Sequence, residues 1–305
     1  LVGIHIPLAA VDAPVLRLMW AAGLGLAIIA SALVIVFLAG RSLSGSIRAF
    51  AKAASAVRDL NFAAAAVPKS VFRELDEAAT AFNSMLQGLR WFEAYVPKTL
   101  VRRLLRQKLL GQIASESRDV TIMFTDIQGF TTMAERMSAD ETASFLNEHF
   151  ELITRCVEAE DGTVDKYIGD GVMAFWGAPE RQDDHAARAC RAARAIRDAV
   201  HADNLRRRER GVIPVNVRIG IHSEKAVVGN IGSHARFNYT VVGDAVNVAS
   251  RVEELGRDLG APGSEVTIVV SATTAQALPP DERPSRSAGF RSLRGRHAKL
   301  ELFLL

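Results

Sequence analysis

The feature that most constrains this chain is a run of 23 residues without a charged side chain, LMWAAGLGLAIIASALVIVFLAG, at residues 18–40. A helix of that length spans about 34 Å at about 1.5 Å per residue, enough to cross a hydrocarbon core of about 30 Å. Three basic residues, Arg41, Arg48 and Lys52, follow the run, and basic residues collect on the cytoplasmic side of a span. We therefore expect a single transmembrane helix in the inner (plasma) membrane, followed by cytoplasmic domains.

The residues before this run are expected outside the cytoplasm. A cleaved signal peptide is the alternative, but its apolar stretch is shorter and its basic residues come first. Within residues 1–17, the segment LVGIHIPL predicts a strand. Because the chain begins at Leu1 rather than at Met, we expect it to be the end part of a longer protein. The strand would then be the last one of an extracytoplasmic sensor whose ligand the sequence does not identify.

Charge and cysteine content narrow the function classes. The 305 residues carry 37 basic and 34 acidic side chains, for a net charge of +3. This balance indicates no nucleic-acid partner, and the densest basic run, residues 206–210, is typical of a solvated helix end. The two cysteines, Cys156 and Cys190, lie in amphipathic patterns and predict reduced thiols in a cytosolic domain.

Residues 41–90 carry two stripes of apolar residues at heptad spacing, separated by a connector around residues 62–68. Such stripes form coiled-coil seams, and a helix pair this small buries too little alone, so we expect a partner copy. Two helices with an extended connector directly after a membrane span resemble a HAMP linker; an ordinary helical linker is the alternative. The stripes are Ile47, Phe50, Ala54, Val57 and Leu60, then Leu75, Ala79, Phe82, Leu86 and Leu89.

Beyond this linker the pattern changes. Residues 91–117 predict a basic amphipathic joint with a helix beginning at Pro97. Residues 118–305 alternate apolar strands with amphipathic helices, which predicts an α+β or α/β domain with one mixed sheet. Strands are expected at 120–125, 163–168, 172–177, 215–223, 226–231, 237–243, 266–271 and 300–305, and helices at 140–159, 185–201 and from 245.

Three fragments of this last domain contain candidate functional residues: FTDIQGFT at 124–131, KYIGDG at 166–171 and YTVVGDAVNVASR at 239–251. Asp126 falls at the expected end of a strand and Asp170 at the tip of a hairpin. Each alone could be a turn or cap residue. Together they could converge on a cation, since carboxylate oxygens are the ligands that Mg²⁺ takes.

In this order, the three fragments resemble the class III nucleotidyl cyclases over residues 118–305. The resemblance implies an α+β fold with a mixed, mainly antiparallel sheet flanked by helices. It also implies two Mg²⁺ ions per site, replaceable by Mn²⁺, held by Asp126, the carbonyl of Ile127 and Asp170. These ions would assist attack of the ribose 3′-hydroxyl on the α-phosphorus and departure of pyrophosphate.

The resemblance assigns further residues to the substrate. Gly129 would let the backbone approach the phosphates, and Phe130 and Thr131 would open a helix whose N–H groups hold an anion. Asn247 and Arg251, four residues apart and therefore on one helix face, would orient the ribose and bind phosphate oxygens. Surface polarity alone could also explain both. Asp244 is expected to be the N-cap of that helix rather than a catalytic residue.

Base recognition would rest on Lys166, donating to adenine N1, and Thr240, accepting from the 6-amino group. Most relatives have Asp at the second position; Thr matches the subclass called IIIb. Guanine readers of the family pair Glu and Cys instead, so ATP is favoured over GTP. Thr is a weaker and more ambivalent partner than Asp, which leaves room for lax selectivity. Arg294 or Arg296 would meet the terminal phosphates.

In the family, the metal carboxylates serve one site while the Lys, Thr, Asn and Arg set serves the site across an interface. One chain with the complete set therefore predicts a homodimer with two equivalent shared sites. We expect a membrane-bound adenylate cyclase that converts ATP to 3′,5′-cyclic AMP and pyrophosphate and is regulated through the linker. The alternatives are a guanylate or dual-specificity cyclase and a catalytically silent nucleotide-binding module.

Overall fold

The computed structural model describes residues 8–93, 115–233, 236–261, 263–292 and 299–305. The chain separates into two compact units, Leu1–Val96 and Pro97–Leu305, each with its own internal contacts. The joint predicted at 91–117, with its helix from Pro97, lies almost entirely outside the described residues.

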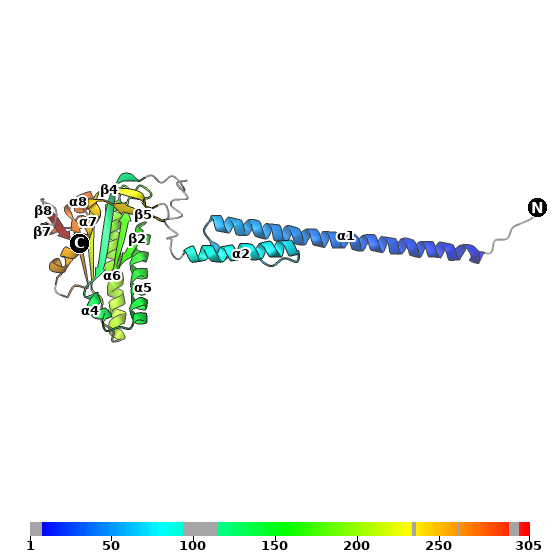
Figure 1. The fold of residues 1–305 in the computed structure, drawn as a ribbon, viewed down its shortest axis with the longest axis horizontal. Coiled ribbons are helices and arrows are strands. Elements are labelled where there is room, and N and C mark those ends of the chain that lie inside the picture. The colour runs from blue at the N-terminus through cyan, green and yellow to red at the C-terminus, as the bar shows by residue number, and fades with distance from the viewer. Residues whose placement is uncertain (1–7, 94–114, 234–235, 262, 293–298) are drawn as a thin grey trace, which may run out of the picture. The chain divides into compact units, whose positions relative to one another are not determined.

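The first unit begins with one long helix, α1 (Leu8–Arg58), which contains the whole apolar run 18–40 (Figure 1). It is long and apolar enough to cross a membrane, judged by length and composition, and its apolar side chains, such as Trp20 and Phe37, are exposed. The strand predicted for LVGIHIPL is wrong at Leu8, which starts α1 because the alanines after it favour a helix. The other residues of that segment lie outside the described part.

The end of α1 packs against α2 (Arg73–Glu93), and the two helices share small apolar clusters. Phe50 and Phe82 meet edge to face, with ring centroids 6.0 Å apart. Two stripe residues differ from expectation: Ile47 and Ala54 are exposed, and Ala53 is buried instead of Ala54. Ala53 and Ala54 are consecutive in the helix, so either could extend the apolar stripe. Val67 of the connector packs against Ala53, which decides that Ala53 is the buried one.

The connector between these helices is extended, as predicted, except for a short 3₁₀ turn, η1 (Phe62–Ala64). Asn83 of α2 holds it with two hydrogen bonds: its Oδ1 accepts from the Val67 N–H at 3.0 Å, and its Nδ2 donates to the Val67 carbonyl at 2.9 Å. Arg90 donates to the carbonyl of Phe62 at 2.7 Å. These hydrogen bonds satisfy the backbone N–H and carbonyl of Val67 and the carbonyl of Phe62 within the unit.

The second unit is built on one eight-stranded sheet of order β2-β3-β1-β4-β6-β8-β7, with β5 paired to β4. Among the described strands, β4 and β6 form the one parallel pair; the other pairs are antiparallel. This confirms the predicted α+β class with a mixed, mainly antiparallel sheet. The strands are β1 (Glu116–Ile127), β2 (Thr163–Ile168), β3 (Gly171–Trp176), β4 (Val217–Ser233), β5 (Arg236–Val242), β6 (Val266–Ser271), β7 (Arg286–Ser292) and β8 (Lys299–Leu304).

Helices cover both faces of the sheet (Figure 1). Alternation along β1 sends Met123 and Ile127 into one core and Val120 and Ile122 into the other. The first core is closed by α5 and α6, and the second by α7. The helices of this unit are α4 (Phe130–Ala134), α5 (Ala139–Ala159), α6 (His185–Glu209), α7 (Asp244–Leu259) and α8 (Ala272–Ala277).

Four elements differ from the sequence prediction. The strands expected at 215–223 and 226–231 are one strand, β4, because pairing with β1 runs unbroken from one into the other. Helix α6 continues beyond residue 201 to Glu209, and its basic last turn suits the negative end of a helix. Strand β7 and helix α8 have sequences too short and mixed to show a clear period, and they were not predicted.

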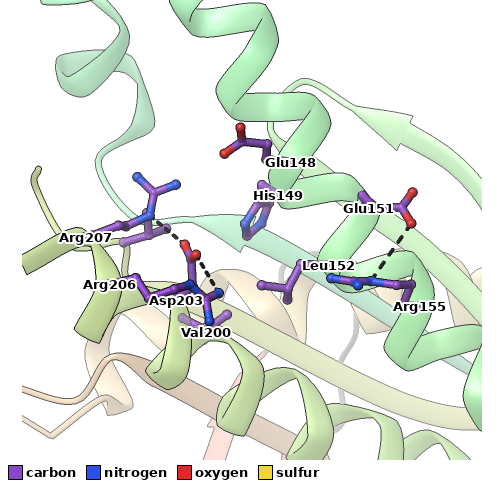
Figure 2. A pocket seen from close by; sticks show the side chains of 10 residues that line it. Glu148, His149, Glu151, Leu152, Arg155, Val200, Asp203, Arg206 and Arg207 are labelled. Carbon is purple, nitrogen blue, oxygen red and sulfur yellow. Dashed lines mark hydrogen bonds and ion pairs between the residues drawn. The ribbon is translucent and has the colours of Figure 1, made fainter. Parts of the chain in front are cut away.

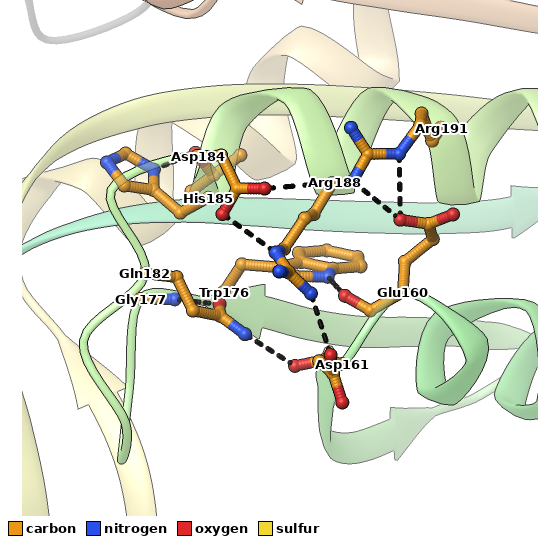
Figure 3. Close-up of polar contacts among 10 residues, drawn as sticks. Glu160, Asp161, Trp176, Gly177, Gln182, Asp184, His185, Arg188 and Arg191 are labelled. Carbon is orange, nitrogen blue, oxygen red and sulfur yellow. Dashed lines mark hydrogen bonds and ion pairs between the residues drawn. The ribbon is translucent and has the colours of Figure 1, made fainter.

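A polar network holds the open end of the β2–β3 hairpin against the start of α6 (Figure 3). Trp176 donates its indole N–H to the carbonyl of Glu160 at 3.0 Å. Arg188 of α6 bonds Asp161 at 2.7 Å and Asp184 at 2.8 Å, and Arg191 bonds Glu160 at 2.8 Å. With its open end anchored in this way, the hairpin presents its other end, the turn at Asp170, in a defined place.

Candidate active site

Asp126 and Asp170 come from separate segments and lie side by side at one edge of the sheet. Asp126 is near the end of β1, and the Asp170 turn reaches it because β3 pairs with β1. The Ile127 N–H donates to Asp170 Oδ2 at 3.0 Å. Gly171 allows this approach, because a Cβ there would stand 2.4 Å from the carbonyl oxygen of Thr125. We call Asp126, Ile127 and Asp170 the acidic edge.

The surroundings of Asp126 raise the pKa of its carboxyl group. Partial burial and then the negative charge of Asp170 raise the pKa of Asp126, while Arg218 opposes the rise. Arg218 lies opposite Asp126 on β4 and bonds its carboxylate directly. Its Nε also donates to Glu253 of α7 at 2.8 Å. Sequence reasoning missed Arg218 and Glu253, because the β1–β4 register that places Arg218 beside Asp126, and the packing of α7 that brings Glu253 to Arg218, exist only in the folded domain.

This donor set fits a divalent cation. Neighbouring carboxylates repel each other until a positive charge joins them, and Mg²⁺ accepts one or two carboxylates together with other oxygens. Among the described residues, no group of three or more His, Cys, Asp or Glu side chains gathers to hold a metal. A metal at the acidic edge would therefore complete its shell with backbone and substrate oxygens, as the sequence predicts for the carbonyl of Ile127.

The segment after the acidic edge turns sharply into α4. Gly129 caps this helix at a φ of 75°, a conformation that favours glycine, and is exposed. Thr131 is exposed in the first turn, whereas Phe130 is half-buried and stacks on Phe145 with centroids 6.2 Å apart. The predicted helix start is confirmed, and the Phe130 ring anchors it to the core.

Lys166 and Thr240 meet although 74 residues separate them. The Lys166 ammonium lies 3.4 Å from the Thr240 hydroxyl, which is buried on β5. A third residue joins them: the Thr240 hydroxyl donates to Asp165 Oδ2 at 2.6 Å, and Lys166 lies 3.4 Å from the same oxygen. Asp165, Lys166 and Thr240 are called the base cluster. Asp165 was missed, because strict strand alternation would send it to the face opposite Lys166.

Asn247 and Arg251 share one face of α7, as their spacing predicts. Asn247 is exposed and Arg251 half-buried, and within the described residues neither side chain has a hydrogen bond or ion pair. The N-cap prediction for Asp244 is wrong: Gly243 is the cap and Asp244 begins the helix, where its charge suits the positive helix end. Arg294 and Arg296 lie outside the described residues.

The cavity shown in Figure 2 contains none of these residues. It has a volume of about 260 Å³ and lies between α5 and α6. Charged side chains line it, including the Arg206–Asp203–Arg207 group, beside the buried ring of His149. The sites predicted from the sequence therefore lie at the sheet edge and on α7 instead of in this cavity.

Comparisons with known proteins agree with the fold. The family model of the adenylate and guanylate cyclase catalytic domain matches residues 113–305. The chain is 34% identical over 277 residues to adenylate cyclase 1 of Rhizobium meliloti, covering 91% of this chain and 41% of that protein. It is also 34% identical over 186 residues to an adenylate cyclase of Anabaena cylindrica, covering 59% of this chain and 36% of that one.

Solved structures give the same picture. The adenylyl cyclase CyaB from P. aeruginosa superposes with a TM-score of 0.57 at 28% identity, over 63% of this chain and 95% of that one. The guanylyl cyclase Cya2 superposes with a TM-score of 0.56 at 29% identity, over 62% of this chain and 92% of that one. The chain spans about two fifths of the length of the curated relatives. Because the family model matches residues 113–305 and the fold agrees with it, the chain belongs to the adenylate and guanylate cyclase catalytic domain family.

Proposed function

We propose that the chain is an adenylate cyclase that converts ATP to 3′,5′-cyclic AMP and pyrophosphate. The observation that carries the choice of ATP is the approach of Lys166 to Thr240 at 3.4 Å. A lysine donor suits adenine N1, and a hydroxyl acceptor suits the 6-amino group. The adenylate cyclases among its relatives support the same substrate, whereas the fold alone resembles adenylyl and guanylyl cyclases equally.

The acidic edge would bind two Mg²⁺, or Mn²⁺ in their place, through Asp126, Asp170 and the Ile127 carbonyl. When bound, such ions lower the pKa of the ribose 3′-hydroxyl and neutralise charge on the transferring phosphoryl group. Arg218 would keep Asp126 charged and aimed at the ion. The exposed backbone at Gly129, Phe130 and Thr131 would hold phosphate oxygens.

On α7, Asn247 would orient the ribose and Arg251 would bind the phosphate oxygens on which charge builds up as the 3′-oxygen attacks the α-phosphorus. Their freedom from other partners among the described residues suits side chains that await a substrate. Arg294 or Arg296 would meet the departing pyrophosphate.

We place these two sets of residues in sites shared between two copies of the chain. Apolar side chains are exposed beside the base cluster, on β2 at Tyr167 and Ile168 and on the β4–β5 pair at Phe237 and Val242, where 37% to 53% of each residue remains accessible. Such a patch favours a protein partner over water, and a second copy would bring its own acidic edge to it.

For the first unit, we propose a membrane anchor and a HAMP linker. Helix α1 would span the inner membrane with residues 18–40 and continue, on the cytoplasmic side, into the helix pair with α2. An extracytoplasmic ligand would act on the catalytic domain through this pair. The exposed apolar surface of α1 and the extended connector held by Asn83 support this arrangement.

The direct test incubates the purified full chain in detergent micelles with Mg²⁺ or Mn²⁺ and either ATP or GTP. We expect cyclic AMP as the main product and a higher kcat/KM for ATP. Cyclic GMP formed with equal or higher kcat/KM would establish a guanylate or dual-specificity cyclase. Absence of any cyclic nucleotide from a dimeric, folded sample would establish a catalytically silent module.

A further inference from the structure

Asp165 occupies an irregular position in its strand. The register of β2 against β3 slips between Val164 and Lys166, so that Asp165 forms a β-bulge. A bulge breaks the alternation of side chains and re-aims one of them. Consecutive residues that would face opposite sides of a regular strand, Asp165 and Lys166, therefore both reach Thr240.

The bond between Asp165 and Thr240 is the dominant contact of this carboxylate. Its length of 2.6 Å is typical of a hydroxyl donating to a charged acceptor, whereas the Lys166 contact, at 3.4 Å, is long. Only 1% of the Asp165 side chain is exposed, compared with 44% of Lys166. A carboxylate buried this deeply needs a donor, and Thr240 supplies it.

The electrostatics agree with this geometry. Burial raises the pKa of Asp165, while the hydrogen bond from Thr240, followed by the charge of Lys166, opposes the rise by favouring the charged form. A surface acid paired loosely with a neighbouring lysine would be neither buried nor bonded in this way.

A threonine hydroxyl has one proton and two lone pairs. Its proton is engaged by Asp165 and one lone pair faces Lys166, so only an acceptor position remains. We propose that Asp165 is a positioning residue that sets base specificity: by holding the Thr240 proton, it makes Thr240 accept the 6-amino group of adenine and reject the 6-oxo group of guanine. This inference depends on the proposed adenylate cyclase activity and removes the ambivalence of threonine as a base reader.

The test compares kcat/KM for ATP, GTP and inosine triphosphate in the full chain and its variants. Inosine triphosphate has the 6-oxo edge of GTP without the 2-amino group, so it isolates position 6. Asp165→Leu keeps the branched shape of the side chain and removes both acceptor oxygens. We expect the preference for ATP over both 6-oxo nucleotides to fall about tenfold, the usual range for one buried polar contact.

Two further variants separate this role from a structural one. Asp165→Asn keeps an acceptor oxygen for Thr240 and should retain the preference within about threefold of wild type. In a Thr240→Val background, Asp165→Leu should change the preference less than about twofold, because the hydroxyl it orients is gone. Asp183→Ala, which removes an exposed acid outside the cluster, serves as the matched control and should leave all three rates unchanged.

The outcomes are distinguishable. If wild type forms no cyclic AMP, or uses GTP and inosine triphosphate as well as ATP, the proposed function fails and this inference fails with it. If wild type prefers ATP but Asp165→Leu keeps that preference, or lowers it equally with and without the Thr240 hydroxyl, Asp165 does not position Thr240 and only this inference is overturned. Should Asp165→Leu not fold, Asp165→Ala is measured by the same criteria.

Discussion

The acidic edge and the base cluster each have residues on the β2–β3 hairpin, yet the polar groups of the two sets differ in how far they are satisfied within the chain. At the acidic edge two like charges, Asp126 and Asp170, lie close together: burial and then the charge of Asp170 raise the pKa of Asp126, while Arg218 opposes the rise. In the base cluster every polar group has a partner of the right polarity inside the chain. Arg218 pairs with Asp126 at the acidic edge, and we expect a bound cation to offset the repulsion that remains, whereas the base cluster presents a preset pattern of donors and acceptors.

The difference teaches what each region contributes. We propose that the acidic edge carries the chemistry, because a site with neighbouring like charges gains most from binding a cation. We propose that the base cluster discriminates between nucleotides, because a base of the wrong polarity would leave buried groups unpaired. Substitutions in the two regions should therefore have different signatures: loss of turnover with every nucleotide in one, and a changed preference between nucleotides in the other.

The largest effect is expected at the acidic edge. Asp126→Ala or Asp170→Ala removes a carboxylate ligand, and we expect the rate with ATP and with GTP to fall at least about a hundredfold. Asp198→Ala, on the exposed side of α6, is the matched control and should keep full activity. Rates within about tenfold of wild type in a folded Asp170→Ala chain would contradict the assignment.

Complementation tests whether the two regions serve one site across a dimer. An Asp170→Ala chain and an Arg251→Ala chain should each be inactive, and a co-expressed mixture should recover up to about a quarter of wild-type activity. Half of randomly paired dimers are heterodimers, and each has one intact site of two. Heterodimers isolated with two different affinity tags that remain inactive would show that the acidic edge and Arg251 are not shared in this way.

Reversing the base cluster tests discrimination. Lys166→Glu with Thr240→Cys exchanges a donor and an acceptor for the groups that guanine requires, and should move the ratio of kcat/KM from ATP toward GTP by one to two decades. Lys166→Glu alone should chiefly reduce use of ATP. An unchanged ratio in a folded, active double variant would show that these residues do not read the base.

The smallest predicted effect is on the pH dependence of stability and involves His149, which lies outside both regions. It should leave the preference between nucleotides unchanged. Burial, assisted by the charge of Arg207, lowers the pKa of His149 from 6.5 to about 4. The unfolded chain therefore binds more protons between these values, and stability falls as pH falls through this window. Between pH 7 and pH 5 the free energy of unfolding should fall by on the order of 2 kcal/mol. Denaturant unfolding of the second unit, Pro97–Leu305, measures this fall.

The control for this effect is a variant that keeps an aromatic ring at position 149 but cannot bind a proton. His149→Phe should flatten the pH dependence, since the Nε2 of His149 has no hydrogen-bond partner among the described residues to lose and aromatic neighbours already flank the ring. Replacing exposed His201 by Gln should leave the dependence in place. An equally steep pH dependence in His149→Phe would show that other groups cause it.

Much of the fold was predictable from periodicity. The long apolar run, the strand 163–168 and the helix 140–159 follow from patterns that local physics imposes within one element. The errors lie where contacts with other segments determine the structure. Strand β4 is continuous because β1 pairs with it without a break from Val217 to Val228, and Ala53 is buried because Val67 covers it. Neither fact depends on the residues of the element itself.

The sequence by itself determined which chemical groups are available: two acids at a strand end and a turn, a lysine and a threonine for a base, and a polar face on a helix. It also determined the class of fold, because hydrophobic periodicity acts locally. Only the tertiary structure decided which groups act together. The register of β4 brings Arg218 to Asp126, and one bulged residue in β2 turns Asp165 toward Thr240. Such contacts depend on strand pairing between distant segments, which local sequence patterns do not encode.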